Sequence, residues 1–79
     1  MDAKTLLKEI SKDTQVYKVL NHMVNIGHIT TYQAYEKYGI TRLPARIADI
    51  SAYGVNVARK TIYDKKRGNH WNEYWIGEQ

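Results

Sequence analysis

The chain has 79 residues, no cysteine and a formal net charge of +4. A chain of this length forms one small domain, and without cysteine it has no disulfide framework, thiolate zinc site or thiol nucleophile. No apolar run approaches the ~20 residues that cross a membrane, and we expect no secretory signal ahead of the first charges.

Residues 1–12 predict a short amphipathic helix. Asp2 can cap its start, and four apolar residues recur at helical spacing: Ala3, Leu6, Leu7 and Ile10. Such a stripe has to be buried, either on the rest of the chain, residues 13–79, or on a partner.

A second helix is expected over about residues 15–26. Asp13 or Thr14 can cap it, and Gly27 ends it. The link that follows, residues 28–29, is short enough to form one or two residues of strand.

Two further helices with a tight corner between them are expected from Thr30 to Gly54. Thr30 and Gln33 fit a capping box at the start of the first, which continues to Tyr38. Gly39 can take the left-handed conformation that stops this helix and turns the chain.

The second helix of this pair covers residues 41–53. Thr41 is a plausible cap, and Pro44 falls in the first turn, where its missing N–H costs little. Two helices at a steep angle around a glycine turn form a helix-turn-helix, whose second helix enters the DNA major groove.

The second helix has two distinct faces. Its apolar stripe, which must be buried, is Leu43, Ile47 and Ile50. The other side carries Arg42, Ala45, Arg46, Asp49 and Tyr53. Arginine suits bidentate contact with guanine or phosphate, and a small neighbour permits close approach to the groove. The alternative for Arg46 is a surface ion pair with Asp49 or Glu36.

The last third of the chain predicts a β-hairpin. Residues 55–63 are rich in β-branched side chains, residues 64–70 form a polar turn, and residues 71–76 form a second strand. Three helices followed by a hairpin make an α+β fold, the winged helix-turn-helix, here with an extra N-terminal helix.

Basic charge gathers on this part of the chain. Between Arg42 and Arg67 there are seven basic side chains against two acidic ones, as expected for a polyanion binder. The hairpin tip would hold DNA phosphates with Lys65, Lys66, Arg67, Asn69 and His70, and each Lys or Arg that reaches a phosphate releases a counterion.

Alternation along the last strand places Tyr74 and Ile76 toward the core and Trp71 and Trp75 on the outer face. Two large tryptophans on an outer face are usually buried by another element of the chain or by a partner. We expect the first helix of the same chain to cover them, and a homodimer is the alternative.

The chain resembles the small helix-turn-helix domains common in bacteriophages and prophages. The shared pattern is a threonine cap, an alanine, Gly39-Ile40, a Leu-x-x-Arg-Ile run at residues 43–47, and the bend at Gly54 into a hairpin. It covers about residues 14–76. The resemblance implies a winged helix that binds DNA in a phage or mobile-element setting.

We therefore predict a protein that binds double-stranded DNA in the cytoplasm of a bacterial host, associated with the nucleoid. Its role would be that of a small phage or prophage transcriptional regulator or an excision-type architectural factor. The residues expected at the DNA are Tyr32, Thr41, Arg42, Ala45, Arg46, Asp49, Lys65, Lys66, Arg67, Asn69 and His70. The alternatives are an adaptor or inhibitor that engages a host or phage protein complex through the tryptophans, and a packaging component.

We do not expect an enzyme or a cofactor. The three histidines, His22, His28 and His70, lack metal-ligand spacing and are expected at the surface or in packing. Tyr17, Tyr35 and Tyr38 are expected to bury their rings with wet hydroxyls.

Overall fold

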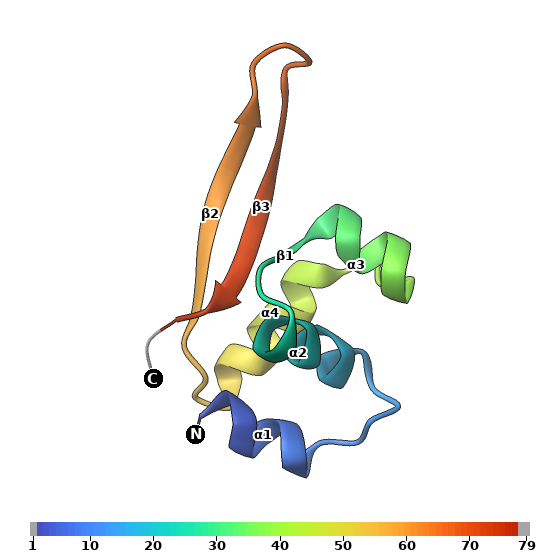
Figure 1. Cartoon of the computed structure of the whole chain (residues 1–79), viewed down its shortest axis with the longest axis vertical. Helices are drawn as coiled ribbons and strands as arrows, with labels where there is room; N and C mark the ends of the chain where they lie inside the picture. The colour runs from blue at the N-terminus through green and yellow to red at the C-terminus, as the bar shows by residue number, and fades with distance from the viewer. Residues whose placement is uncertain (1, 78–79) are drawn as a thin grey trace.

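The computed structural model describes residues 2–77, in which four helices are combined with a three-stranded antiparallel sheet (Figure 1). The helices are α1 (Ala3–Glu9), α2 (Gln15–Asn25), α3 (Thr31–Tyr38) and α4 (Leu43–Ala52), and the strands are β1 (Ile29–Thr30), β2 (Val57–Asp64) and β3 (Asn69–Ile76). The sheet order is β1-β3-β2. The helices gather at one end, and the β2–β3 hairpin stands out beyond them.

Side-chain caps begin the first three helices. Asp2 Oδ1 accepts from the Thr5 N–H at 2.8 Å, a hydrogen bond that lowers the pKa of Asp2. Thr14 caps α2, and Thr30 and Gln33 form the expected capping box at α3. Gly39 ends α3 in the left-handed region, with φ 67°, which confirms the sequence-based assignment of the corner.

The start of α4 differs from the prediction. Its N-cap is Arg42, and no side chain caps the helix. If Thr41 were the N-cap, Pro44 would be the third residue of the helix. An N-cap side chain accepts a hydrogen bond from the backbone N–H at that position, and proline has no N–H to donate. The first turn instead closes on the Arg42 carbonyl, which accepts from Ala45 and Arg46.

One core unites the helices with the sheet. The α4 stripe of Leu43, Ile47 and Ile50 is buried as expected, together with Val19, Leu20 and Met23 of α2 and Tyr74 of β3. Ala3 and Leu6 of α1 belong to the same core, and Leu7 and Ile10 pack against it. The N-terminal helix therefore lies against its own chain.

The strands of the hairpin run closer to its tip than the sequence indicated. Pairing runs from Val57 opposite Ile76 to Asp64 opposite Asn69, so the turn is residues 65–68 rather than 64–70. The Asp64 carboxylate accepts from the backbone N–H groups of Lys66 and Arg67, which closes the tight turn and lets pairing continue to its edge. At the other end, β2 begins two residues later than expected because Val55 is buried in the core.

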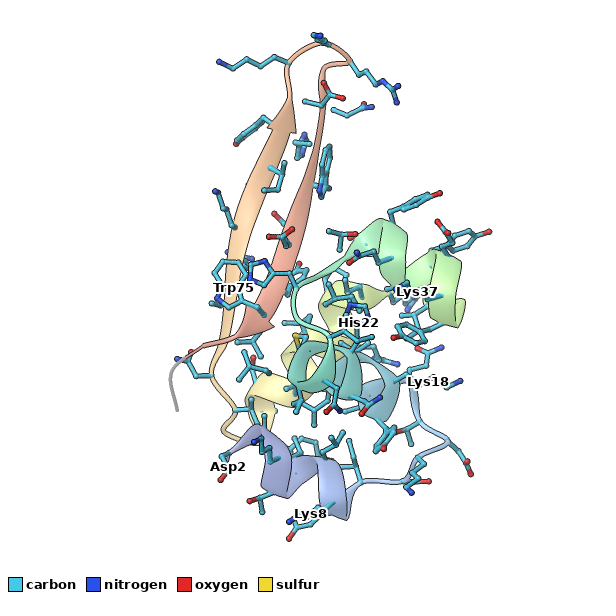
Figure 2. The ribbon with its side chains drawn as sticks, viewed as in Figure 1. Asp2, Lys8, Lys18, His22, Lys37 and Trp75 are labelled. Atoms are coloured by element: carbon cyan, nitrogen blue, oxygen red, sulfur yellow. The ribbon has the colours of Figure 1, made fainter. Side chains whose placement is uncertain are left out.

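The tryptophans are not covered by α1, whose apolar stripe is used on the core. Trp75 is half-buried because the His28 ring stacks on it, with the ring centroids 4.5 Å apart (Figure 2). β1 pairs with β3, and this pairing carries His28 to the outer face of the hairpin, where its Nδ1 lies 2.6 Å from Glu73 Oε1. Trp71 remains 38% exposed.

A buried histidine joins α2 to α3. His22 is fully enclosed; its Nδ1 lies 2.8 Å from the Tyr38 hydroxyl and its Nε2 lies 3.0 Å from the His28 carbonyl oxygen. Burial lowers the pKa of His22, and the charge of Lys37 adds to this effect. Tyr38 and Tyr17 are half-buried as expected, whereas Tyr35 is 61% exposed, contrary to the prediction.

Candidate nucleic-acid interface

The outward face of α4 is built from small side chains. Successive residues turn by about 100°, so burying Leu43, Ile47 and Ile50 turns the opposite face outward. That face carries Ala45, Ala48 and Ala52. Ala48 and Ala52 are exposed and Ala45 is half-buried. A helix face with such short side chains can approach another surface closely.

Arg46 lies on the flank of α4 that meets α2. Its Nε is 3.1 Å from Asp49 Oδ2, and its Nη1 donates to Gln15 Oε1 at 3.4 Å. The Nε–H is enclosed and does not point at the carboxylate, so the contact with Asp49 is an ion pair rather than a hydrogen bond. Of the two ion-pair partners that the sequence left open for Arg46, Asp49 and Glu36, the structure has Asp49.

The N-terminal end of α4 is open. Thr41 and Arg42 are both exposed, and the Arg42 guanidinium extends from the residue that caps the helix. Of the two arginines expected on this helix, Arg42 is the one that is fully available to a ligand.

A cleft of about 300 Å³ separates α4 from β2. It is lined by Pro44, Ala48 and Ser51 on the helix side and by Arg59 on the strand side. Arg59 pairs with the buried Tyr74, so it lies on the sheet face that turns toward the helices. The sequence analysis did not select Arg59, because its place depends on the register of β2 against β3, which the sequence alone does not show.

The hairpin tip is exposed throughout. Lys65, Lys66, Arg67, Asn69 and His70 all lie in solvent. The Arg67 side chain is 80% exposed, and its Nε is 4.0 Å from Asp64 Oδ2. The tip projects beyond the helices, and α4 lies beside the root of the hairpin (Figure 1).

A second cleft, of about 500 Å³, lies between the start of α3 and the hairpin; we call it the α3–hairpin cleft. Its lining includes Tyr32, Gln33, Asp64, Arg67, Asn69 and Trp71. Tyr32 is 72% exposed, and the hydrogen bond of its hydroxyl with Glu36, followed by the charge of that carboxylate, raises the pKa of Tyr32. Glu36 is therefore engaged by Tyr32.

The fold and this surface agree with a comparison against known families. A family model described as a winged helix-turn-helix domain matches residues 14–79. The chain belongs to this family. Within the family's terms, α4 is the recognition helix and the β2–β3 hairpin is the wing, and membership indicates a DNA-binding domain. No curated protein and no solved structure matches the chain.

Within residues 2–77 of this winged helix-turn-helix protein, no helix is long and apolar enough to span a membrane. Nor do His, Asp and Glu side chains gather there in a group of three that could hold a metal ion.

Proposed function

We propose that this protein binds double-stranded DNA, with α4 in the major groove and the wing on the sugar–phosphate backbone. One observation carries the proposal: the small-residue face of α4 is open and lies beside the root of a hairpin whose exposed cationic tip projects beyond the helices. A major groove about 12 Å wide admits a helix of this kind. The proposed role is binding without a chemical step.

In this proposal, base contacts come from the first half of α4. Arg42 reaches a guanine edge or a phosphate, Thr41 donates to a neighbouring phosphate, and the Ala45 methyl group packs against a thymine methyl. Ala48, which the sequence analysis did not select, continues the same surface by one helical turn.

Arg46 joins the interface when it exchanges Asp49 for a phosphate. The ion pair is a third to a half exposed, and pairs of that kind contribute about 0–1 kcal/mol. Leaving Asp49 is therefore a small cost for Arg46. Asp49 is then left to accept a hydrogen bond from a base such as the N4 amino group of cytosine.

Backbone contacts come from the wing and from the start of α3. The wing side chains are Lys65, Lys66, Arg67, Asn69 and His70, to which the structure adds Arg59 in the α4–β2 cleft. On the other side of the hairpin, Tyr32 stands at the first turn of α3.

For the biological role, we propose a small phage or prophage transcriptional regulator or an excision-type architectural factor, acting in the bacterial cytoplasm at the nucleoid. The resemblance of residues 14–76 to phage helix-turn-helix domains supports this role. A homodimer on a palindromic site is the form we propose for a regulator; footprinting would then find half-sites 10–10.5 base pairs apart or at multiples of that spacing.

The test is fluorescence anisotropy with labelled duplex DNA between 50 and 200 mM salt. We expect Lys66→Ala to weaken binding to all sequences and to reduce the slope of log K against log salt by about one unit. Lys8→Ala is the matched control, because Lys8 is exposed on α1 at the end of the molecule opposite the wing tip (Figure 2). Arg42→Ala should cost about 1–3 kcal/mol on a selected site and relax its specificity.

Absence of duplex binding at 50 mM salt would overturn the proposal and favour the adaptor or inhibitor of a protein complex. For that alternative, the tryptophans offer a partner protein less exposed surface than the sequence indicated, because the His28 ring already covers part of Trp75. Binding with no preference among DNA sequences would favour the packaging component instead.

A further inference from the structure

The α3–hairpin cleft brings together two aromatic rings from distant parts of the chain. Tyr32 comes from the first turn of α3 and Trp71 from β3, and both are substantially exposed. Aromatic rings cost free energy when they face water, and here they line a cleft beside the DNA-binding elements. They are therefore suited to hold a flat, π-faced ligand.

Each ring has a neighbour that limits its motion. Tyr32 interacts with Glu36 one turn further along α3, and Trp71 has Ile62 of β2 as its cross-strand partner. Limited motion of the free rings lowers the conformational entropy lost when a ligand stacks on them.

The polar groups of the cleft match a nucleotide. Gln33 uses its amide oxygen to accept from the Thr30 N–H, which leaves its NH₂ donors for a base edge. Asn69 offers a second amide on the wing side, and the exposed Arg67 offers a guanidinium for phosphate. Asp64 does not oppose an anion strongly, because its carboxylate already accepts from two backbone N–H groups and lies near Arg67.

The size and charge of the cleft favour a nucleotide over a protein segment. Its volume of about 500 Å³ is that of a small-molecule site. Lys65 and Lys66 are exposed next to Arg67, so the wing side of the cleft is cationic.

We propose that the α3–hairpin cleft binds one unstacked deoxynucleotide, with its base between Tyr32 and Trp71 and its phosphate on Arg67. This inference rests on the proposed function, and it adds a preference to it: the protein binds a duplex with an unpaired nucleotide at its edge more tightly than the same duplex fully paired. Stacking on an aromatic side chain contributes about 1–3 kcal/mol per base, which corresponds to roughly 5- to 150-fold in affinity.

The experiment compares two labelled duplexes of the same sequence, one fully paired and one with a single unpaired thymidine, by anisotropy at constant salt. We expect the unpaired thymidine to tighten binding by at least fivefold. Trp71→Ala should remove this gain and leave binding to the paired duplex within twofold. Tyr32→Ala should also remove the gain, and it should weaken binding to the paired duplex as well, because Tyr32 contacts the backbone in the proposed function. Tyr35→Ala is the matched control, since Tyr35 is exposed on the same helix but does not line the cleft, and it should keep the gain.

Tryptophan fluorescence gives a readout that does not depend on affinity. The chain has two tryptophans, so Trp75→Phe leaves Trp71 as the sole reporter and Trp71→Phe leaves Trp75. We expect the unpaired thymidine to quench the first protein and not the second.

The inference fails if the two duplexes bind equally while salt-dependent duplex binding is intact, and the proposed function then stands. It also fails if the gain persists in Trp71→Ala, or if Trp75 is quenched instead of Trp71. If neither duplex binds, the proposed function and the inference both fail.

Discussion

Removing the Tyr38 hydroxyl should destabilise the domain through the buried His22. The His28 carbonyl can only accept a hydrogen bond, so His22 Nε2 carries the proton and donates to it. Nδ1 of the neutral ring is then an acceptor, and the Tyr38 hydroxyl donates to it at 2.8 Å. Tyr38→Phe keeps the ring of residue 38 and deletes only this donor.

The magnitude follows from the burial of His22. Because His22 is fully enclosed, Nδ1 has no access to water in the variant, and a buried acceptor without a partner costs about 1–3 kcal/mol. In a domain of this size each kcal/mol lowers the melting temperature by about 4–8 °C. The expected loss is a large share of the stability of a small domain.

The assay is urea unfolding followed by circular dichroism at pH 8, where His22 is neutral in both the folded and the unfolded chain. Tyr35→Phe is the control, since it removes a hydroxyl from an exposed residue of the same helix and should change the unfolding free energy by less than about 0.5 kcal/mol. A Tyr38→Phe protein within 0.5 kcal/mol of the unmodified chain would refute the assigned hydrogen bond.

Four further predictions follow from the same structure. The pKa of His22 is lowered in the folded state, so on acidification the unfolded chain binds the proton first. The free energy of unfolding should therefore fall below pH 6.5, by at most about 1.4 kcal/mol per pH unit. Urea curves in which the free energy of unfolding rises on acidification would contradict this. Thr30→Ala should cost about 0.5–2 kcal/mol in thermal unfolding by breaking the capping box. Gly39→Ala should cost about 1–2 kcal/mol through its left-handed backbone alone, because nothing lies within 4 Å of an added Cβ; an unchanged melting temperature would show that φ relaxes. Asp49→Ala should release Arg46 and raise affinity for non-specific duplex DNA by up to about fivefold in an anisotropy titration, while it relaxes any preference for the base that Asp49 contacts; weaker binding to non-specific duplex DNA would contradict this.

Local chemistry was enough to predict most of the elements. The capping box at Thr30 and the turn at Gly39 depend on neighbours within four residues, and both have the expected geometry. The buried stripe of α4 follows from helical spacing alone. Thr41 does not cap α4, because Pro44 occupies the position whose N–H the Thr41 side chain would need.

Contacts between distant segments could not be predicted in the same way. Nothing in the sequence shows that His28 stacks on Trp75, because that contact depends on the register of β1 against β3. The same holds for Arg59, whose place in the α4–β2 cleft is set by its pairing with Tyr74. For Arg46, helical spacing and the α3–α4 corner left Asp49 and Glu36 open as ion-pair partners; the structure has the pair with Asp49, and the guanidinium also donates to Gln15 of α2.

The two-residue strand β1 divides the wing into parts of unequal stiffness. It pairs with β3 only at Tyr74 and Glu73, so the hairpin has a third strand at its base and none from there to the tip. A two-stranded ribbon twists more readily than a wider sheet. The core and β1 therefore fix the direction of the hairpin at its base, whereas its basic tip is free to twist. In the proposed complex, this twist would let the tip adapt to a DNA groove whose width changes with base sequence.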